Sequence, residues 1–259
     1  GGGIEFKDFR KYTFEDDASD IDWRASLKSD ETLVREYESY KTLNIYILVD
    51  LSDSMLFTSE EKLKAEYAAE LAYDLCDVLV EGDEAVGFAS FTDRIDTLIR
   101  PTMGKDMMPR VRKRLNDTDF YGGKGDIGDV LKLMRATARQ PALVILITDF
   151  ISVSDEWERY LAMVAEEVHT LGIMLRDPRD SQLPREPAQY ILQDTERQTS
   201  VIADTKALRQ QYKQVTQQHE EHVEQMFKEY AIGFTKAFTG SRMYPTLTHF
   251  FRRIARAGA

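Results

Sequence analysis

The chain is poor in cysteine: Cys76 is the single one among 259 residues, so an internal disulfide is excluded. It also lacks an uninterrupted apolar run of transmembrane length and a basic-then-apolar start of the secretory kind. We therefore expect a cytoplasmic protein without a membrane span. Cys76 lies in an apolar helical pattern, which favours a small core residue over a reactive thiol.

Several motifs of enzymes and metalloproteins are also missing. The four histidines, His169, His219, His222 and His249, do not have the spacing of a zinc site, and no cysteine accompanies them. The sequence contains neither a Gly-x-x-x-x-Gly-Lys-Ser/Thr loop nor a Gly-x-Ser-x-Gly turn. The residues therefore give no support for a zinc protein, a P-loop ATPase or a serine hydrolase.

Positive charge is scarce, because 34 Lys and Arg stand against 45 Asp and Glu, for a net charge of -11. Affinity for nucleic acids depends largely on clustered basic residues, so we expect a protein partner or a cation instead. One local exception is the cluster of Arg110, Arg112, Lys113 and Arg114. We interpret it as a solvated helix face near an acidic surface.

What the sequence does contain is two continuous apolar runs, at residues 43–49 and 142–147, each followed by an aspartate. Such runs are typical of buried parallel strands. The first ends in Asp50-Leu51-Ser52-Asp53-Ser54 and the second in Thr148-Asp149. Since open α/β folds bind ligands at the carboxyl ends of their strands, these carboxylates and hydroxyls are expected to converge there.

Carboxylate and hydroxyl oxygens suit a small hard cation such as Mg²⁺, which prefers octahedral oxygen coordination and retains waters. A third loop, the Gly-rich segment 121–126, lies between the two strands and opens a helical stretch. The candidate metal-site residues are Asp50, Ser52, Ser54, Asp149 and Asp126.

Other roles are open for some of these residues. Asp50 can instead cap the helix that follows it, and Asp53 and Asp126 can orient waters or, for Asp126, cap a helix rather than bind metal directly. Lys124 can neutralise the acidic cluster when metal is absent, or be an ordinary solvated loop lysine.

The motif Asp50-x-Ser52-x-Ser54 with the later Asp149 resembles the metal-ion-dependent adhesion site of von Willebrand factor A domains. The resemblance implies that Ser52 and Ser54 hold a divalent cation directly, Mg²⁺ or else Mn²⁺ or Ca²⁺. Asp50 and Asp149 would bind it directly or through waters, and a partner carboxylate would fill the open position. Gly125 stands where the family has a threonine, so one hydroxyl ligand of the family's site is missing here.

A second resemblance covers most of the chain. The stretch from Asp16-Asp17 to Ile21-Asp22-Trp23 is similar to the Gly-Asp-Asp…Ile-Asp-Trp signature of a bacterial and archaeal family of unknown function, with Glu15 in place of the usual Gly. The segments 176–180 and 192–196 resemble late motifs of that family. Its members are typically encoded beside MoxR-type AAA+ ATPases, which implies an adaptor role with such an ATPase in the assembly or activation of a protein complex.

The pattern of elements predicts a three-layer, doubly wound α/β fold with a mostly parallel central sheet and an antiparallel edge strand. Residues 1–42 form an N-terminal prelude expected to pack on the core, and residues 43–259 form the A-like domain. That domain includes a helical extension over about 204–259 with a long amphipathic helix and a short final helix at 247–255. The predicted helices are 59–80, 109–115, 127–138 and 155–170, and Thr58 or Ser59 is expected to cap the first of them. Besides the two apolar runs, the predicted strands are 85–91, 95–99, 172–175, 190–192 and 200–202.

Three functions are compatible with this pattern. The first is a non-enzymatic, metal-dependent module for binding proteins. The second is a domain that keeps the fold without metal and binds partners through its late helix. The third is a Mg²⁺-dependent hydrolase, for which no general base stands out beyond the metal cluster.

Overall fold

The computed structural model describes residues 4–14, 16–29, 31–39, 43–151, 156–180, 189–194 and 199–241. The chain divides into two compact units, Gly1–Thr42 and Leu43–Ala259. The helix predicted at 247–255 lies outside the described residues.

The first unit is a two-stranded antiparallel ribbon of β1 (Ile4–Lys11) and β2 (Leu33–Ser39). Between the strands lie a 3-10 turn (Ala18–Asp20) and the short helix α1 (Trp23–Ser26). The Asp22 carboxylate caps α1 by accepting the backbone N–H groups of Arg24 and Ala25, both at 2.9 Å. Trp23 is 65% exposed, and the packing of this unit on the core stays a prediction.

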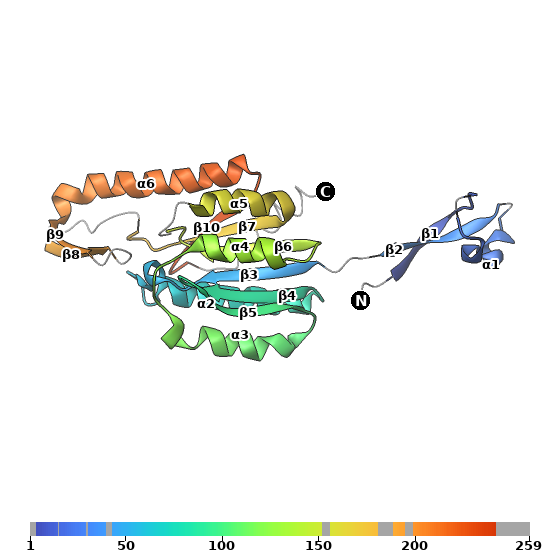
Figure 1. Cartoon of the computed structure of the whole chain (residues 1–259), viewed down its shortest axis with the longest axis horizontal. Helices are drawn as coiled ribbons and strands as arrows, with labels where there is room; N and C mark the ends of the chain where they lie inside the picture. Colours follow the sequence, from blue (N-terminus) through green and yellow to red (C-terminus); the bar gives the residue numbers. More distant parts are fainter. Residues whose placement is uncertain are drawn as a thin grey trace. The chain divides into compact units, whose positions relative to one another are not determined.

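The second unit is built on a six-stranded sheet with the strand order β10-β7-β6-β3-β4-β5 (Figure 1). All neighbours are parallel except β4 and β5, so β5 is an antiparallel edge strand. This arrangement is von Willebrand A-like and confirms the predicted fold class. The strands are β3 (Asn44–Asp50), β4 (Ala85–Phe91), β5 (Ile95–Thr102), β6 (Ala142–Thr148), β7 (His169–Arg176) and β10 (Gly233–Phe238).

Helices cover both faces of the sheet because its central strands are apolar on both sides. In β3, Ile45, Ile47 and Val49 pack in one cluster with α2 and α3, whereas Tyr46 and Leu48 pack in a second cluster with α4, α5 and α6. The helices are α2 (Lys64–Glu81), α3 (Met108–Leu115), α4 (Ile127–Thr137), α5 (Glu156–Glu167) and α6 (Thr205–Glu229).

The start of α2 differs from the prediction. The helix begins at Lys64 instead of residue 59, and neither Thr58 nor Ser59 caps it. The Thr58 hydroxyl donates to the Lys62 carbonyl at 2.7 Å, which closes a separate turn before the helix. The Glu66 carboxylate then accepts the Leu63 N–H at 2.9 Å, as a third-residue glutamate does at many helix N-termini.

The late region also differs. The long helix α6 ends at Glu229, and residues 233–238 form the edge strand β10, parallel to β7. Ala231 adopts a left-handed conformation (φ 53°), and the Ile232 N–H donates to the Phe227 carbonyl at 2.8 Å. These are the features of a helix C-terminus. The predicted long helix is therefore confirmed over Thr205–Glu229, and the extension also adds an edge strand to the sheet.

Smaller boundaries shift as well. Helix α5 ends at Glu167, three residues early, and strand β7 is longer than the predicted 172–175. The predicted strands 190–192 and 200–202 are confirmed as β8 (Gln189–Asp194) and β9 (Thr199–Asp204), which pair in antiparallel fashion.

The second half of α6 is fixed on β7 by Phe227, which is fully buried. A Cβ at Gly172 of β7 would lie 2.3 Å from Cε1 of Phe227, so only glycine leaves room for the ring. Phe150 and Phe234 enclose the same ring at centroid distances of 5.1 and 4.9 Å. The apolar stripe of α6 that the sequence showed is thus partly used inside the protein.

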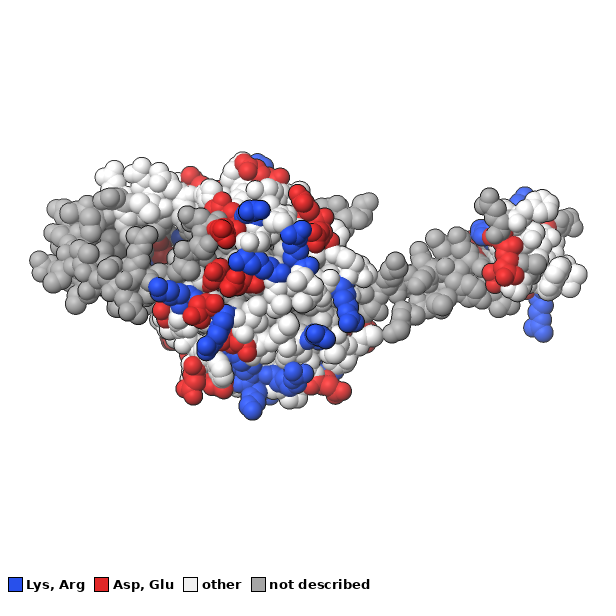
Figure 2. Space-filling model, viewed as in Figure 1, with Lys and Arg blue, Asp and Glu red and all other residues white. Residues whose placement is uncertain are grey.

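Basic and acidic side chains alternate over the visible face of this unit, without a large patch of one sign (Figure 2). In the predicted basic cluster, Arg110 and Lys113 are exposed, as expected. Arg114 is 6% exposed and lies 3.4 Å from the Asp96 carboxylate, so the prediction of a solvated face is wrong for this residue. In the described part of the chain, no helix is both long and apolar enough to cross a bilayer.

Candidate metal site

The two predicted strand ends meet at one edge of the sheet. Strand β3 is directly paired with β6, so Asp50 at the end of β3 lies beside the Thr148-Asp149 end of β6. Asp50, Ser52 and Asp149 are fully buried, and Ser54 is 6% exposed. The structure therefore brings four of the predicted metal-site residues together beneath the surface.

Asp50 is held in place through both carboxylate oxygens. Its Oδ1 accepts the Ser52 N–H at 2.9 Å, and its Oδ2 accepts the Thr148 hydroxyl at 2.6 Å. Burial, followed by the negative charge of Asp149, raises the pKa of Asp50 to about 7. Asp50 is thus a carboxylate that gains from a nearby positive charge.

The hydroxyls and Asp149 form a compact set of oxygens. The Oγ atoms of Ser52 and Ser54 are 3.3 Å apart, and Ser54 Oγ donates to Asp149 Oδ1 at 3.1 Å. Neighbouring ligands of an octahedral Mg²⁺ with bonds of about 2.0–2.1 Å lie about 2.9 Å apart. The observed separations exceed this by only a few tenths of an ångström.

The donor set therefore fits a hard divalent cation. Among the described residues, no group of three or more His, Cys, Asp and Glu is arranged to hold a metal. The serine hydroxyls are consequently essential to any site at this position, and an oxygen-preferring ion suits it better than a thiophilic one.

The Gly-rich loop docks on the loop that carries the serines. Gly122 and Gly123 have positive φ values of 97° and 102°. This conformation lets the Gly122 N–H donate to the Leu51 carbonyl and the Gly123 N–H donate to the Asp53 carboxylate, both at 2.8 Å. Asp53 thus holds the two loops together.

Gly125 and Asp126 follow directly. A Cβ at Gly125 would lie 3.0 Å from Ser52 Oγ and 3.3 Å from the Ile151 carbonyl oxygen, so the backbone fills the space near the donor set. Asp126 caps α4, because its Oδ1 accepts the Gly128 N–H at 2.8 Å. This contact supports the capping role for Asp126, and its role as a metal ligand stays a prediction.

A lysine completes the site. The Lys64 ammonium at the start of α2 is 1% exposed and donates to Asp149 Oδ2 at 2.9 Å and to Asp180 Oδ2 at 3.0 Å. Burial opposes the charge of Lys64, but Asp149 and Asp180 outweigh it and raise the pKa of Lys64. Burial likewise opposes the charge of Asp149, and Lys64 outweighs it and lowers the pKa of Asp149. Lys124, considered for this role from the sequence, is exposed.

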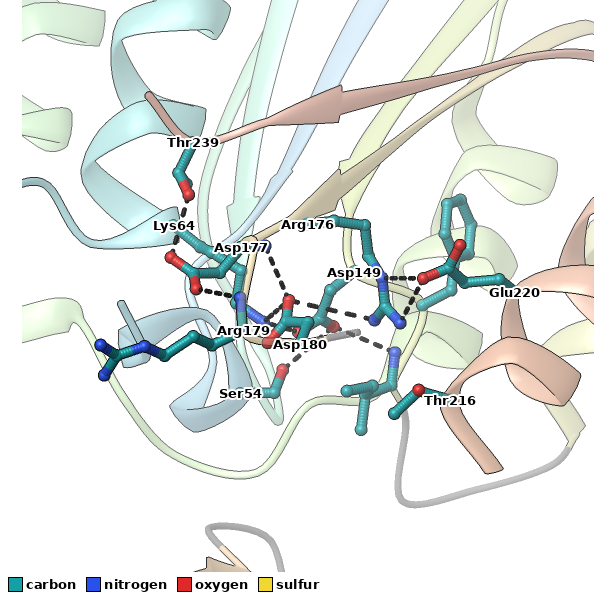
Figure 3. A network of polar contacts seen from close by, with 12 residues as sticks. Ser54, Lys64, Asp149, Arg176, Asp177, Arg179, Asp180, Thr216, Glu220 and Thr239 are labelled. Atoms are coloured by element: carbon teal, nitrogen blue, oxygen red, sulfur yellow. Dashed lines mark hydrogen bonds and ion pairs between the residues drawn. The ribbon is translucent and has the colours of Figure 1, made fainter. Parts of the chain in front are cut away.

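An ionic network extends from Lys64 toward α6 and β10 (Figure 3). Asp180 also accepts the Asp177 N–H at 2.9 Å. The buried Arg176 guanidinium donates through Nε and Nη2 to Glu220 of α6 at 3.0 and 2.8 Å. Lys236 of β10 lies 3.3 Å from the other oxygen of Glu220. The carboxyl end of β7 is therefore tied to the late helix by paired charges.

The turn after β6 is strained. Phe150 has a φ of 60°, which is unusual for a bulky residue. Its ring is buried against Trp157 at a centroid distance of 5.5 Å, and its N–H donates to the Thr148 hydroxyl at 3.1 Å. Packing thus holds a backbone conformation that places Asp149 against Ser54.

Lys64 and Asp180 lie at this site but were not predicted from the sequence. Lys64 could have been found because it lies on the buried side of α2, four residues before Ala68 and seven before Leu71. Asp180 follows the end of a third parallel strand, so the argument that identified Asp50 and Asp149 also applies to it. His219 of α6 lies beside the Asp149 backbone, and burial lowers the pKa of His219. Because His219 is far from Asp149 in the sequence, no local pattern predicts this contact.

Residues 8–222 match a family described as Protein of unknown function DUF58. An uncharacterized protein of Mycobacterium tuberculosis is 24% identical over 198 residues, which are 76% of this chain and 62% of that protein. An uncharacterized protein of Mycobacterium avium is 32% identical over 75 residues, 29% of this chain and 43% of that protein. The chain therefore spans about 62% of the length of the first of these relatives.

Two solved structures are similar to part of this chain. The conserved hypothetical protein BatB from Bacteroides thetaiotaomicron is similar with a TM-score of 0.47 and 17% identity, over 73% of this chain and 98% of that one. Proximal thread matrix protein 1 from the mussel byssus, with a zinc-occupied MIDAS motif, has a TM-score of 0.40 and 20% identity, over 52% of this chain and 38% of that one.

Proposed function

This chain belongs to the DUF58 family, and we propose that it is a non-enzymatic module that binds another protein through a divalent cation. The observation that carries the proposal is the oxygen set at the carboxyl edge of the sheet, in which Ser54 Oγ lies 3.3 Å from Ser52 Oγ and 3.1 Å from Asp149 Oδ1. Ser52 and Ser54 would hold the ion directly, and Asp50 and Asp149 would bind it directly or through waters.

The ion, when bound, supplies a strong local positive charge on a protein whose net charge is -11. A carboxylate of a partner can then fill a coordination position that the protein leaves open. Ser54 is 6% exposed whereas Asp50, Ser52 and Asp149 are fully buried, so we expect a partner to approach from the side of Ser54. Nearby, Phe57 is 42% exposed and Lys124 is exposed, so the rim offers an apolar contact and a positive charge to an acidic segment.

The family resemblance supports a more specific form of the proposal. We infer that the partner is a MoxR-type AAA+ ATPase and that the chain acts as its cytoplasmic adaptor in assembling or activating a client complex. The mixed surface charge in Figure 2 and the internal engagement of Arg114 favour a protein partner over a nucleic acid.

The test is co-purification with a MoxR-type AAA+ ATPase, in Mg²⁺ and in EDTA. The Ser52→Ala/Ser54→Ala double variant is compared with Ser90→Ala, which removes a buried hydroxyl that makes no hydrogen bond. We expect capture by the wild type and Ser90→Ala in Mg²⁺ only, and no capture by the double variant. Capture that is equal in EDTA and by the double variant would refute metal dependence.

The same experiment separates the alternatives. If binding occurs through α6, it survives loss of both serines but is weakened by Val215→Asp, since Val215 is 58% exposed on that helix. Val223, Met226 and Phe227 face the core and leave less apolar surface on α6 for a partner. A Mg²⁺-dependent hydrolase would instead show turnover that Asp50→Asn abolishes.

A further inference from the structure

Lys64 occupies a position that is unfavourable for an ammonium. It is the first residue of α2, where the helix dipole is positive, and its side chain is 1% exposed. Among the described residues, the carboxylates of Asp149 and Asp180 offset these costs, and the Phe57 ring lies 5.9 Å from the ammonium. The Lys64 ammonium therefore stabilises the buried carboxylates, whereas its charge is unfavourable for the N-terminus of α2.

The contact with Asp149 affects the metal site directly. Asp149 presents Oδ1 to Ser54 and to the Ile151 N–H, while Oδ2 is bound by Lys64. Lys64 thus neutralises part of the charge that a divalent cation would meet. The glycine at position 125, where a hydroxyl ligand is expected, acts in the same direction by removing a donor.

Lys64 has a second carboxylate partner that it could keep if an ion were bound. Asp180 accepts the same ammonium at 3.0 Å and is itself fixed by the Asp177 N–H at 2.9 Å. Lys64 can therefore lose its bond to Asp149 and still retain a buried carboxylate partner. The side chain need not leave the protein for the ion to bind.

We propose that Lys64 is a built-in counter-cation of this site: it stabilises the folded site without metal and sets the concentration of divalent cation at which the site fills. The inference rests on the proposed metal-dependent function. It accounts for the burial of the Asp149 and Asp180 carboxyls around one ammonium group. It also implies that the wild-type site requires more Mg²⁺ than the same site without the ammonium.

The test is calorimetric titration of Mg²⁺ into chelator-stripped full chain carrying Lys64→Met. Lys62→Met is the matched control. Lys62 lies two residues before Lys64 and carries the same charge, but its ion pair with Glu70 is exposed. We expect Lys64→Met to bind Mg²⁺ at least tenfold more tightly than the wild type, and Lys62→Met to bind like the wild type. In thermal unfolding, Lys64→Met should melt lower than the wild type in EDTA and recover in Mg²⁺.

A second pair of variants covers the case in which Lys64→Met does not fold. Asp180→Asn is compared with Lys64→Met/Asp180→Asn, and the double variant should bind Mg²⁺ more tightly than the single one. Equal or weaker binding without Lys64 would overturn the role of Lys64 alone. Absence of Mg²⁺ binding in every variant and in the wild type would overturn the metal-dependent function together with it.

Discussion

Gly172→Ala tests the packing of α6 on β7. This packing positions Glu220 and His219 of α6 beside the candidate site. The added Cβ would lie 2.3, 2.6 and 3.2 Å from three ring carbons of Phe227. Since carbon atoms in contact are about 3.5–4.0 Å apart, the ring would have to move by about 1 Å or more. Phe150 and Phe234 enclose the ring and oppose this movement.

Overpacking of this kind costs about 1–3 kcal/mol, and the short distances place Gly172→Ala near the upper end. In a unit of this size, that corresponds to a fall in Tm of about 4–12 °C. The matched control is Gly82→Ala, because a Cβ there would meet only ordinary contacts at 3.4 and 3.6 Å. We expect Gly82→Ala to change the Tm by no more than a few degrees.

The assay is thermal and urea unfolding of the full chain followed by circular dichroism. Phe227→Leu should recover part of the loss when combined with Gly172→Ala, since the smaller side chain leaves room for the Cβ. A Gly172→Ala variant that unfolds with the same midpoint as Gly82→Ala would refute the close packing of α6 on β7.

Three further predictions follow from buried groups. The pKa of Asp50 is raised to about 7, so between about pH 4 and pH 7 the folded protein keeps a proton that the unfolded chain has lost. The free energy of unfolding in EDTA should therefore fall as the pH rises through this range, by at most about 1.4 kcal/mol per pH unit. Urea unfolding of Asp50→Asn should lack this pH dependence, and an unchanged dependence would contradict the prediction. Burial raises the pKa of Cys76 to about 12, so a thiol reagent at pH 8 should react only after unfolding, and rapid reaction with the native protein would contradict this. Glu220→Gln weakens the partner of buried Arg176 and should destabilise by about 1–3 kcal/mol, whereas Glu224→Gln, 58% exposed, should be nearly neutral; equal effects would refute the network.

The sheet and the four central site residues could be predicted because their signals are local. The apolar runs before Asp50 and Asp149 identify neighbouring buried strands, and the Asp-x-Ser-x-Ser spacing identifies the donor loop. The mostly parallel order then follows from the alternation of strands and helices.

The pairing of Lys64 with Asp149 and Asp180, and the strand β10, could not be predicted in the same way because they depend on contacts distant in sequence. Lys64 is stabilised in the core by carboxylates 85 and 116 residues away. Residues 233–238 continue an amphipathic pattern, and what makes them a strand is the helix end at Ala231 and the free edge of β7. Tertiary contacts thus override the local pattern at both places.

Titration of Mg²⁺ into chelator-stripped wild-type protein, beside Asp50→Ala, tests the central claim most directly. The account predicts saturable binding by the wild type, with Mn²⁺ replacing Mg²⁺, and loss of that binding in Asp50→Ala. Absence of binding in the wild type, or identical binding in both proteins, would contradict a metal site at the ends of β3 and β6.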